Sequence, residues 1–108
     1  MRPLALLAII LIAIGALFLI ARSDDESAED RGLAIVEANC AECHAVALND
    51  ESPLSGAPPF RELHEDYPVE DLAEALAEGI MTGHTGMPQF ALETDEIEDV
   101  ISYLQTLE

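Results

Sequence analysis

The hydrophobic pattern divides the chain into an apolar leader and a more polar remainder. After Arg2, the residues from Leu4 to Ala21 are all apolar or glycine, an uninterrupted run of 18. As a helix this run would be about 27 Å long, slightly less than the hydrocarbon core of a bilayer, which is about 30 Å thick. It is typical of either a secretory signal peptide or an uncleaved membrane anchor. Both interpretations predict that the segment after residue 22 is exported.

Cleavage of the leader is left open by the sequence. A weak small-x-small site at residues 21–23 would allow a signal peptidase to act. However, the apolar run is longer than the roughly 7–15 residues of an ordinary signal peptide, which favours an anchor. We therefore expect a signal peptide or anchor (1–22), an acidic tether (23–29) and a folded domain (30–108). The expected location is the periplasm, either soluble or held at the outer face of the inner membrane.

Three helices are predicted after the tether. Ser27, with Asp30 three residues later, predicts a weak capping box for the first helix, which we expect to reach about Cys43. Pro68 suits the first position of the second helix, and Gly79 suits its end. No alternating strand pattern is present, so the sequence predicts an all-α domain.

The second and third helices each carry one apolar face. We expect Thr94 to cap the third helix. The apolar positions are Val69, Leu72, Leu76 and Ile80 in the second helix, and Ile97, Val100, Ile101 and Leu104 in the third. Because so small a domain with few aromatic side chains has little core of its own, a bound group is expected to complete it.

The segment NCAECHA places Cys40 and Cys43 three residues apart, with His44 directly after them. Residues three or four apart share one face of a helical turn, so these three side chains can contact one large object. A zinc site would need a second pair of ligands, but the chain has no third cysteine, and His64 and His84 are too far apart. A thioredoxin-like dithiol would need a preceding strand, whereas the preceding sequence is helical in pattern. The spacing therefore indicates c-type haem attachment through both thiols, with the histidine bound to the iron.

A second axial ligand is predicted in the segment TGHTGMPQF. Met87 offers a soft thioether, the usual partner of histidine on the iron of an electron carrier. Gly86 before it allows close approach of the backbone to a bound group, and Pro88 after it stiffens the loop. His84 is an alternative ligand if the methionine loop loosens.

With these ligands, the chain resembles the small single-haem class I cytochromes c of bacteria. The resemblance implies the cytochrome c fold, in which three main helices and loops surround one covalently bound haem c. It also implies that the first and last helices cross where Gly32 meets Tyr103. In the GAPPF segment, it implies that the carbonyl of Pro58, or else of Pro59, accepts a hydrogen bond from His44. The chain has no tryptophan, so the contact that many members make to a haem propionate is not assigned.

The resemblance implies an exported electron carrier that passes one electron between redox proteins. With His44 and Met87 both on the iron, no coordination position is vacant, so the chain is not expected to be an enzyme. Two alternatives remain open. One is a haem subunit of a larger dehydrogenase or oxidase, and the other is a haem-based ligand sensor or peroxidase with a labile Met87.

Net charge narrows the choice of partner. All 22 acidic residues follow Ser23, whereas only Arg31 and Arg61 of the basic residues do, so this part carries a formal charge of 2 minus 22, or −20. Such a surface excludes nucleic acid and anionic lipid as ligands. A redox partner with a basic docking patch would suit it, although adaptation to a salty habitat would give the same composition.

Overall fold

The computed structural model describes residues 3–20, 26–79, 86–89 and 91–108, and their regular secondary structure is entirely helical. The helices are α1 (Pro3–Ile20), α2 (Ala28–Asn39), α3 (Leu63–Asp66), α4 (Leu72–Glu78) and α5 (Thr94–Gln105). Two short 3-10 turns, η1 (Phe60–Glu62) and η2 (Val69–Asp71), lead into α3 and α4. No strand occurs in this part of the chain, in agreement with the all-α prediction.

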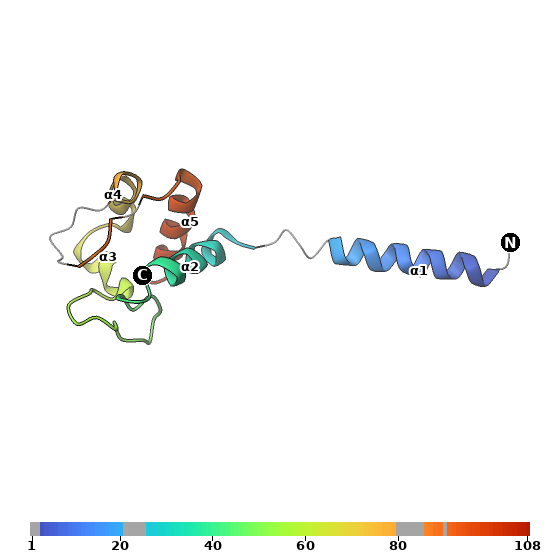
Figure 1. Cartoon of the computed structure of the whole chain (residues 1–108), viewed down its shortest axis with the longest axis horizontal. Helices are drawn as coiled ribbons and strands as arrows, with labels where there is room; N and C mark the ends of the chain where they lie inside the picture. The colour runs from blue at the N-terminus through green and yellow to red at the C-terminus, as the bar shows by residue number, and fades with distance from the viewer. Residues whose placement is uncertain (1–2, 21–25, 80–85, 90) are drawn as a thin grey trace.

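The apolar leader forms α1, which stands apart from the other helices (Figure 1). Within the described ranges, no helix combines the length and the apolar character needed to cross a membrane. The predicted boundary at residue 22 falls in the segment 21–25, which lies outside the described residues. The division into leader, tether and domain therefore stays a prediction.

Helix α2 begins as predicted and ends earlier than predicted. Ser27 caps it: its hydroxyl oxygen accepts a hydrogen bond of 3.1 Å from the backbone N–H of Asp30. The prediction that this helix reaches Cys43 is wrong, because the backbone leaves helical geometry at Cys40 (φ −122°, ψ −26°). The cysteine segment instead forms a turn directly after the helix, in which the N–H of His44 donates to the carbonyl of Cys40 over 2.9 Å.

The other two predicted helices are present with shifted starts. Pro68 is extended (ψ 131°), so it precedes the 3-10 turn η2 and does not occupy the first position of α4. Gly79 ends α4 as predicted, with φ 89°, a conformation that favours glycine. In α5 the cap is Glu93 and not Thr94, because Glu93 and Glu96 form a reciprocal capping box. Ile80, expected on the apolar face of the second helix, lies outside the described residues.

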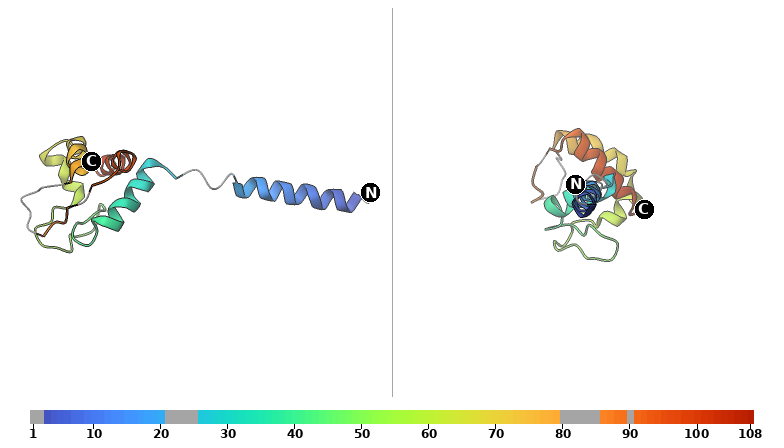
Figure 2. Two further views of the ribbon diagram at one scale, coloured as in Figure 1. Left: turned by 45° about the horizontal axis from the view of Figure 1, so that its top comes forward. Right: turned by 90° about the vertical axis from the view of Figure 1, so that its right-hand side faces the viewer.

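Helices α2 and α5 lie side by side and hold the fold together (Figure 2). The crossing is tight at the buried Gly32, where an added Cβ atom would lie 2.0 Å from the carbonyl oxygen of Asp99. It would also lie 2.8 Å from the Cβ of Tyr103. The predicted meeting of Gly32 with Tyr103 is therefore present.

The apolar faces of the helices meet around this crossing. Buried side chains from α2, α3, η2, α4 and α5, from the loop after His44 and from the C-terminal turn form one cluster. Its members are Val36, Val46, Leu63, Val69, Leu76, Ile97, Val100, Tyr103, Leu104 and Leu107. Tyr67, Leu72, Phe60 and Leu92 pack against the cluster while remaining partly exposed. The core is small, and much of it lines one side of the cavity described below.

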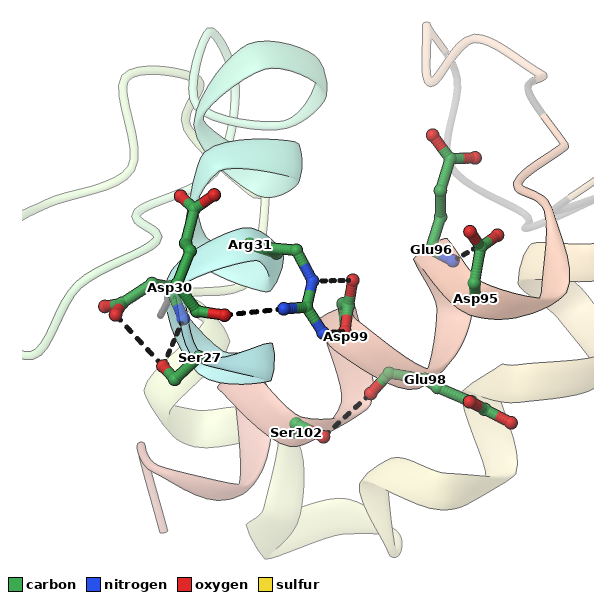
Figure 3. Close-up of polar contacts among 9 residues, drawn as sticks. Ser27, Asp30, Arg31, Asp95, Glu96, Glu98, Asp99 and Ser102 are labelled. Carbon is green, nitrogen blue, oxygen red and sulfur yellow. Dashed lines mark hydrogen bonds and ion pairs between the residues drawn. The ribbon is translucent and has the colours of Figure 1, made fainter. Parts of the chain in front are cut away.

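A polar clasp lies beside the helix crossing (Figure 3). The guanidinium of Arg31 donates two hydrogen bonds, of 2.8 and 2.9 Å, to the two carboxylate oxygens of Asp99. A third bond of 2.6 Å reaches the backbone carbonyl of Glu26, just before α2 begins. This bidentate contact fixes the register of α2 against α5 and holds the pKa of Asp99 below its usual range.

The tight crossing predicts that Gly32→Ala destabilises the domain. The new methyl group would overlap the backbone of Asp99, so the helices would have to move apart, at a cost of about 1–3 kcal/mol. Denaturant unfolding of the full holoprotein, followed by the signal of the bound haem, measures this loss. Ala34→Ser, at an exposed position of the same helix, is the control and should leave the midpoint nearly unchanged. An unchanged midpoint in Gly32→Ala would contradict the observed geometry.

The clasp also predicts a pH dependence of stability. The pKa of Asp99 is lowered in the folded state, so the stabilisation by this group is present above its unfolded pKa of about 3.9 and is lost as the pH falls through the folded value. The stability of Asp99→Asn should therefore fall less than that of the wild type when the pH is lowered below about 4. Unfolding midpoints measured across that range test this. Glu98→Gln, at a neighbouring acid outside the clasp, should retain the wild-type profile.

Candidate functional site

The two cysteines and the histidine of the CxxCH segment lie together in the turn after α2. The N–H of Cys43 and that of His44 both donate to the carbonyl of Cys40, over 3.2 and 2.9 Å. Cys40 in turn donates its own N–H to the carbonyl of Val36 over 2.8 Å, which ties the turn to the end of the helix. Both cysteines are partly buried, and they do not form a disulfide with each other. The turn thus presents two sulfurs and one imidazole at the end of the helix.

The imidazole of His44 is held by a backbone carbonyl. Its Nδ1 lies 2.8 Å from the carbonyl oxygen of Pro58, and its ring centroid lies 5.0 Å from that of Phe60. A carbonyl can only accept, so Nδ1 carries the hydrogen, and Nε2 is left as the basic nitrogen that can bind a metal. Of the two prolines in the GAPPF segment, the structure brings Pro58 to His44.

A cavity of about 570 Å³ opens beside this turn. Cys40, Cys43, His44, Pro58 and Met87 all line it, so the structure brings every predicted site residue to one space. The apolar lining comprises Ile35, Val36, Leu54, Phe60, Leu63, Leu72, Leu76, Leu92, Val100 and Leu104. A volume of this size with mainly apolar walls and a few polar groups is typical of a ligand or cofactor site.

The methionine segment, 43 residues after His44 in the sequence, lies beside the same cavity. Gly86, Met87 and Pro88 line the cavity, and Gly86 has φ 93°, with no atom within 4 Å of a Cβ added there. The positive φ is a conformation that favours glycine, and it turns the chain directly before the sulfur-bearing residue. His84, the alternative ligand, lies outside the described residues.

Burial affects the chemistry of the first thiol. It raises the pKa of Cys40 to about 11, because the apolar surroundings penalise the thiolate. A redox dithiol requires a lowered thiol pKa, so the environment of Cys40 disfavours that chemistry.

The loop between His44 and Pro58 is braced by contacts that sequence reasoning missed. The N–H of Ala45 donates to the hydroxyl oxygen of Ser52 over 3.0 Å, and the carbonyl of Ala45 accepts from the N–H of Phe60 over 2.9 Å. The hydroxyl of Tyr103, on α5, donates to the carbonyl of Val46. The cluster of asparagine, aspartate and serine at residues 49–52 was an available turn signal, whereas the contact from Tyr103 had no local signal.

Asp50 organises the same loop. Its carboxylate oxygens accept hydrogen bonds from the N–H groups of Val46 and Ala47, over 3.2 and 3.1 Å. The guanidinium of Arg61 donates to the backbone carbonyl of Asp50 over 2.7 Å. Together with Ser52 and Tyr103, these bonds hold the backbone that follows His44.

The donor set fits a large, flat, apolar group held at one edge by two sulfurs. Two thiols and a metal-binding imidazole lie at one wall, a methionine segment lines the cavity as well, and apolar side chains form most of the remaining lining. Within the described ranges, no group of three or more His, Cys, Asp or Glu side chains could hold a metal ion by itself. A haem attached through both cysteines matches the size and polarity of this space.

Comparison with known proteins agrees with this geometry. The family model described as cytochrome c matches residues 29–108, which is most of the chain. No curated protein and no solved structure gives a match.

Proposed function

The chain belongs to the cytochrome c family, and we propose that it is an exported single-haem electron carrier in which His44 and Met87 bind the iron. Family membership carries the general part of this statement: the protein binds haem c covalently through Cys40 and Cys43 and serves haem-based electron transfer. The haem supplies a reversible one-electron couple when it is bound. The ligand pair, the export and the role as a carrier are the proposal.

One observation carries the ligand assignment: His44 and Met87 line the same cavity although 42 residues of sequence lie between them. His44 is oriented by the carbonyl of Pro58, which leaves Nε2 as its metal-binding nitrogen. Met87 lies between Gly86, where the chain turns with a positive φ, and Pro88, which stiffens the backbone after it. With His44 already oriented and Met87 beside the same cavity, the iron would change its charge with little rearrangement of its ligands.

The protein contributes an apolar, shaped surrounding for the redox centre. Leu63, Leu72, Leu76 and Leu104 belong to the lining of the cavity, and an apolar surrounding favours the less charged form of a buried metal centre. A soft thioether ligand acts in the same direction. Both effects suit a centre that is reduced and oxidised without binding a substrate.

Export is supported by the apolar run of 18 residues before the domain. Covalent haem attachment in bacteria takes place outside the cytoplasm, so an exported domain agrees with the cofactor. We propose a periplasmic location, with residues 4–21 acting as a membrane anchor if they are retained. Redox proteins are the partners, either as transient donors and acceptors or within a larger dehydrogenase or oxidase.

Attachment through two sulfurs predicts one haem per chain that survives acid denaturation. Cys40→Ala or Cys43→Ala should leave haem on one thioether or lose it, because each bond holds the group independently of folding. Mass spectrometry of the denatured protein measures this. Ser55→Ala, at a cavity residue without sulfur, should retain both bonds. A wild-type mass equal to that of the bare polypeptide would exclude covalent haem.

Ligation by Met87 predicts a far-red sulfur-to-iron charge-transfer band in the oxidised protein. Met87→Ala should abolish this band, open the sixth coordination position and lower the reduction potential. Absorption spectroscopy and redox titration measure both effects. His84→Asn is the control and should leave the band unchanged. If the wild type lacks the band and its iron is still six-coordinate, His84 replaces Met87 as the candidate ligand. If the band is missing and the sixth position is open, a sensor or peroxidase becomes the better interpretation.

A further inference from the structure

We propose that Glu42, between the two attachment cysteines, is the contact through which this protein recognises a redox partner that presents lysine or arginine side chains. The inference rests on the proposed electron-carrier function and deepens it by naming the residue and the chemistry of the partner. It joins three features: the charge of the cavity lining, the engagement of both arginines, and the exposure of the cavity rim.

The first feature is the charge of the cavity lining. Among the described residues that line it, Glu42 is the one carboxylate, and no lysine or arginine is present. The side chain is exposed, so it belongs to the mouth of the cavity and not to its floor. Cys40 and Cys43 are its near neighbours in the chain, so the charge lies close to the edge at which the haem is attached. Electron transfer through that edge therefore takes place beside a fixed negative charge.

The second feature is that both arginines of the domain are engaged by the protein itself. Arg31 donates to both carboxylate oxygens of Asp99 and to the carbonyl of Glu26. Arg61 donates to the carbonyl of Asp50 and lies 3.8 Å from its carboxylate. Neither arginine lines the cavity. No arginine of the described domain therefore neutralises the negative charge of Glu42 at the mouth of the cavity.

The third feature is an exposed apolar rim next to this charge. Leu54 lines the cavity and is 48% exposed, and its backbone N–H donates to the carbonyl of Cys43, the residue after Glu42, over 3.1 Å. Gly56 and Gly86 also line the cavity, and no atom lies within 4 Å of a Cβ added at either. A partner can therefore approach the rim closely. A small apolar contact with one charge beside it suits a transient complex, in which electrostatic attraction between the partners speeds association.

These features together favour a protein with a basic patch as the occupant of this surface. A lysine or arginine of the partner would pair with Glu42 while an apolar group covers Leu54. The other exposed carboxylates of the domain would add long-range attraction, which salt screens. Glu42 differs from them because it lines the mouth, so its removal should affect electron transfer more than the removal of a distant acid.

The test uses the reduced full-length holoprotein and two small oxidants of opposite charge. Tris(phenanthroline)cobalt(III) is a trivalent cation, and hexacyanoferrate(III) is a trivalent anion. Stopped-flow absorption gives the rate constant for each oxidant at low and at high salt. Glu42→Gln is compared with Glu98→Gln, which makes the same change of charge on α5, where Glu98 lies beside the helix crossing and does not line the cavity (Figure 3).

We expect Glu42→Gln to lower the rate with the cationic oxidant by roughly two- to five-fold at low salt and to raise the rate with the anionic oxidant. Glu98→Gln should change either rate by less than about 1.5-fold, and high salt should remove the difference between the variants. Equal effects of the two substitutions would overturn the proposal, because the net charge alone would then control the rate. No effect of Glu42→Gln would overturn it as well.

A second measurement covers the case in which Glu42→Gln does not mature. Pentalysine, added to the wild type, should compete with the cationic oxidant and slow its reaction, whereas pentaglutamate should not. Failure of pentalysine to compete would contradict a basic partner at the mouth. A wild-type protein without a c-type haem spectrum would instead overturn the proposed function, and this inference with it.

Discussion

The close approach of α2 and α5 at Gly32 is the constraint on which the remaining structure depends. A side chain at this position would meet the backbone of Asp99 at 2.0 Å, so the two helices can pack at this distance only because glycine has no Cβ. The bidentate bond between Arg31 and Asp99 then fixes how far one helix can slide along the other. The crossing sets the position of the end of α2, and the cysteine segment begins at that end.

The same helix crossing also positions His44, through the loop that follows it. Tyr103, which packs against Gly32, also donates its hydroxyl hydrogen to the carbonyl of Val46 in the loop that follows His44. The loop is completed by bonds from Ala45 to Ser52 and Phe60, and Pro58 returns to the imidazole. His44 is therefore held between a helix end and a loop that are both attached to α5. A donor restrained in this way can meet a metal with little rearrangement.

Core and cofactor site are not separate in this domain. Val36, Leu63, Leu76, Val100 and Leu104 belong to the buried cluster and also line the cavity. A bound haem would therefore cover apolar surface that the polypeptide cannot cover by itself, and it would act as part of the core. The charged surface is organised differently. Both arginines are bound within the protein, so the carboxylates determine the surface charge that a partner meets.

The sequence by itself determined the chemistry of the site and the type of fold. The spacing of Cys40, Cys43 and His44, the pairing of Gly86 with Met87 and the periodicity of the later helices are local features, and local features can be recognised without coordinates. Helix boundaries differed from the prediction: Glu93 and not Thr94 caps α5, and α2 ends at Asn39, because competing caps and turns differ by small free energies. Only the tertiary structure decided three features: the engagement of both arginines, the bond from Tyr103 to Val46, and the position of Glu42 as the one carboxylate among the described residues at the cavity. Each depends on the distance between segments that are remote in the chain, and packing sets that distance.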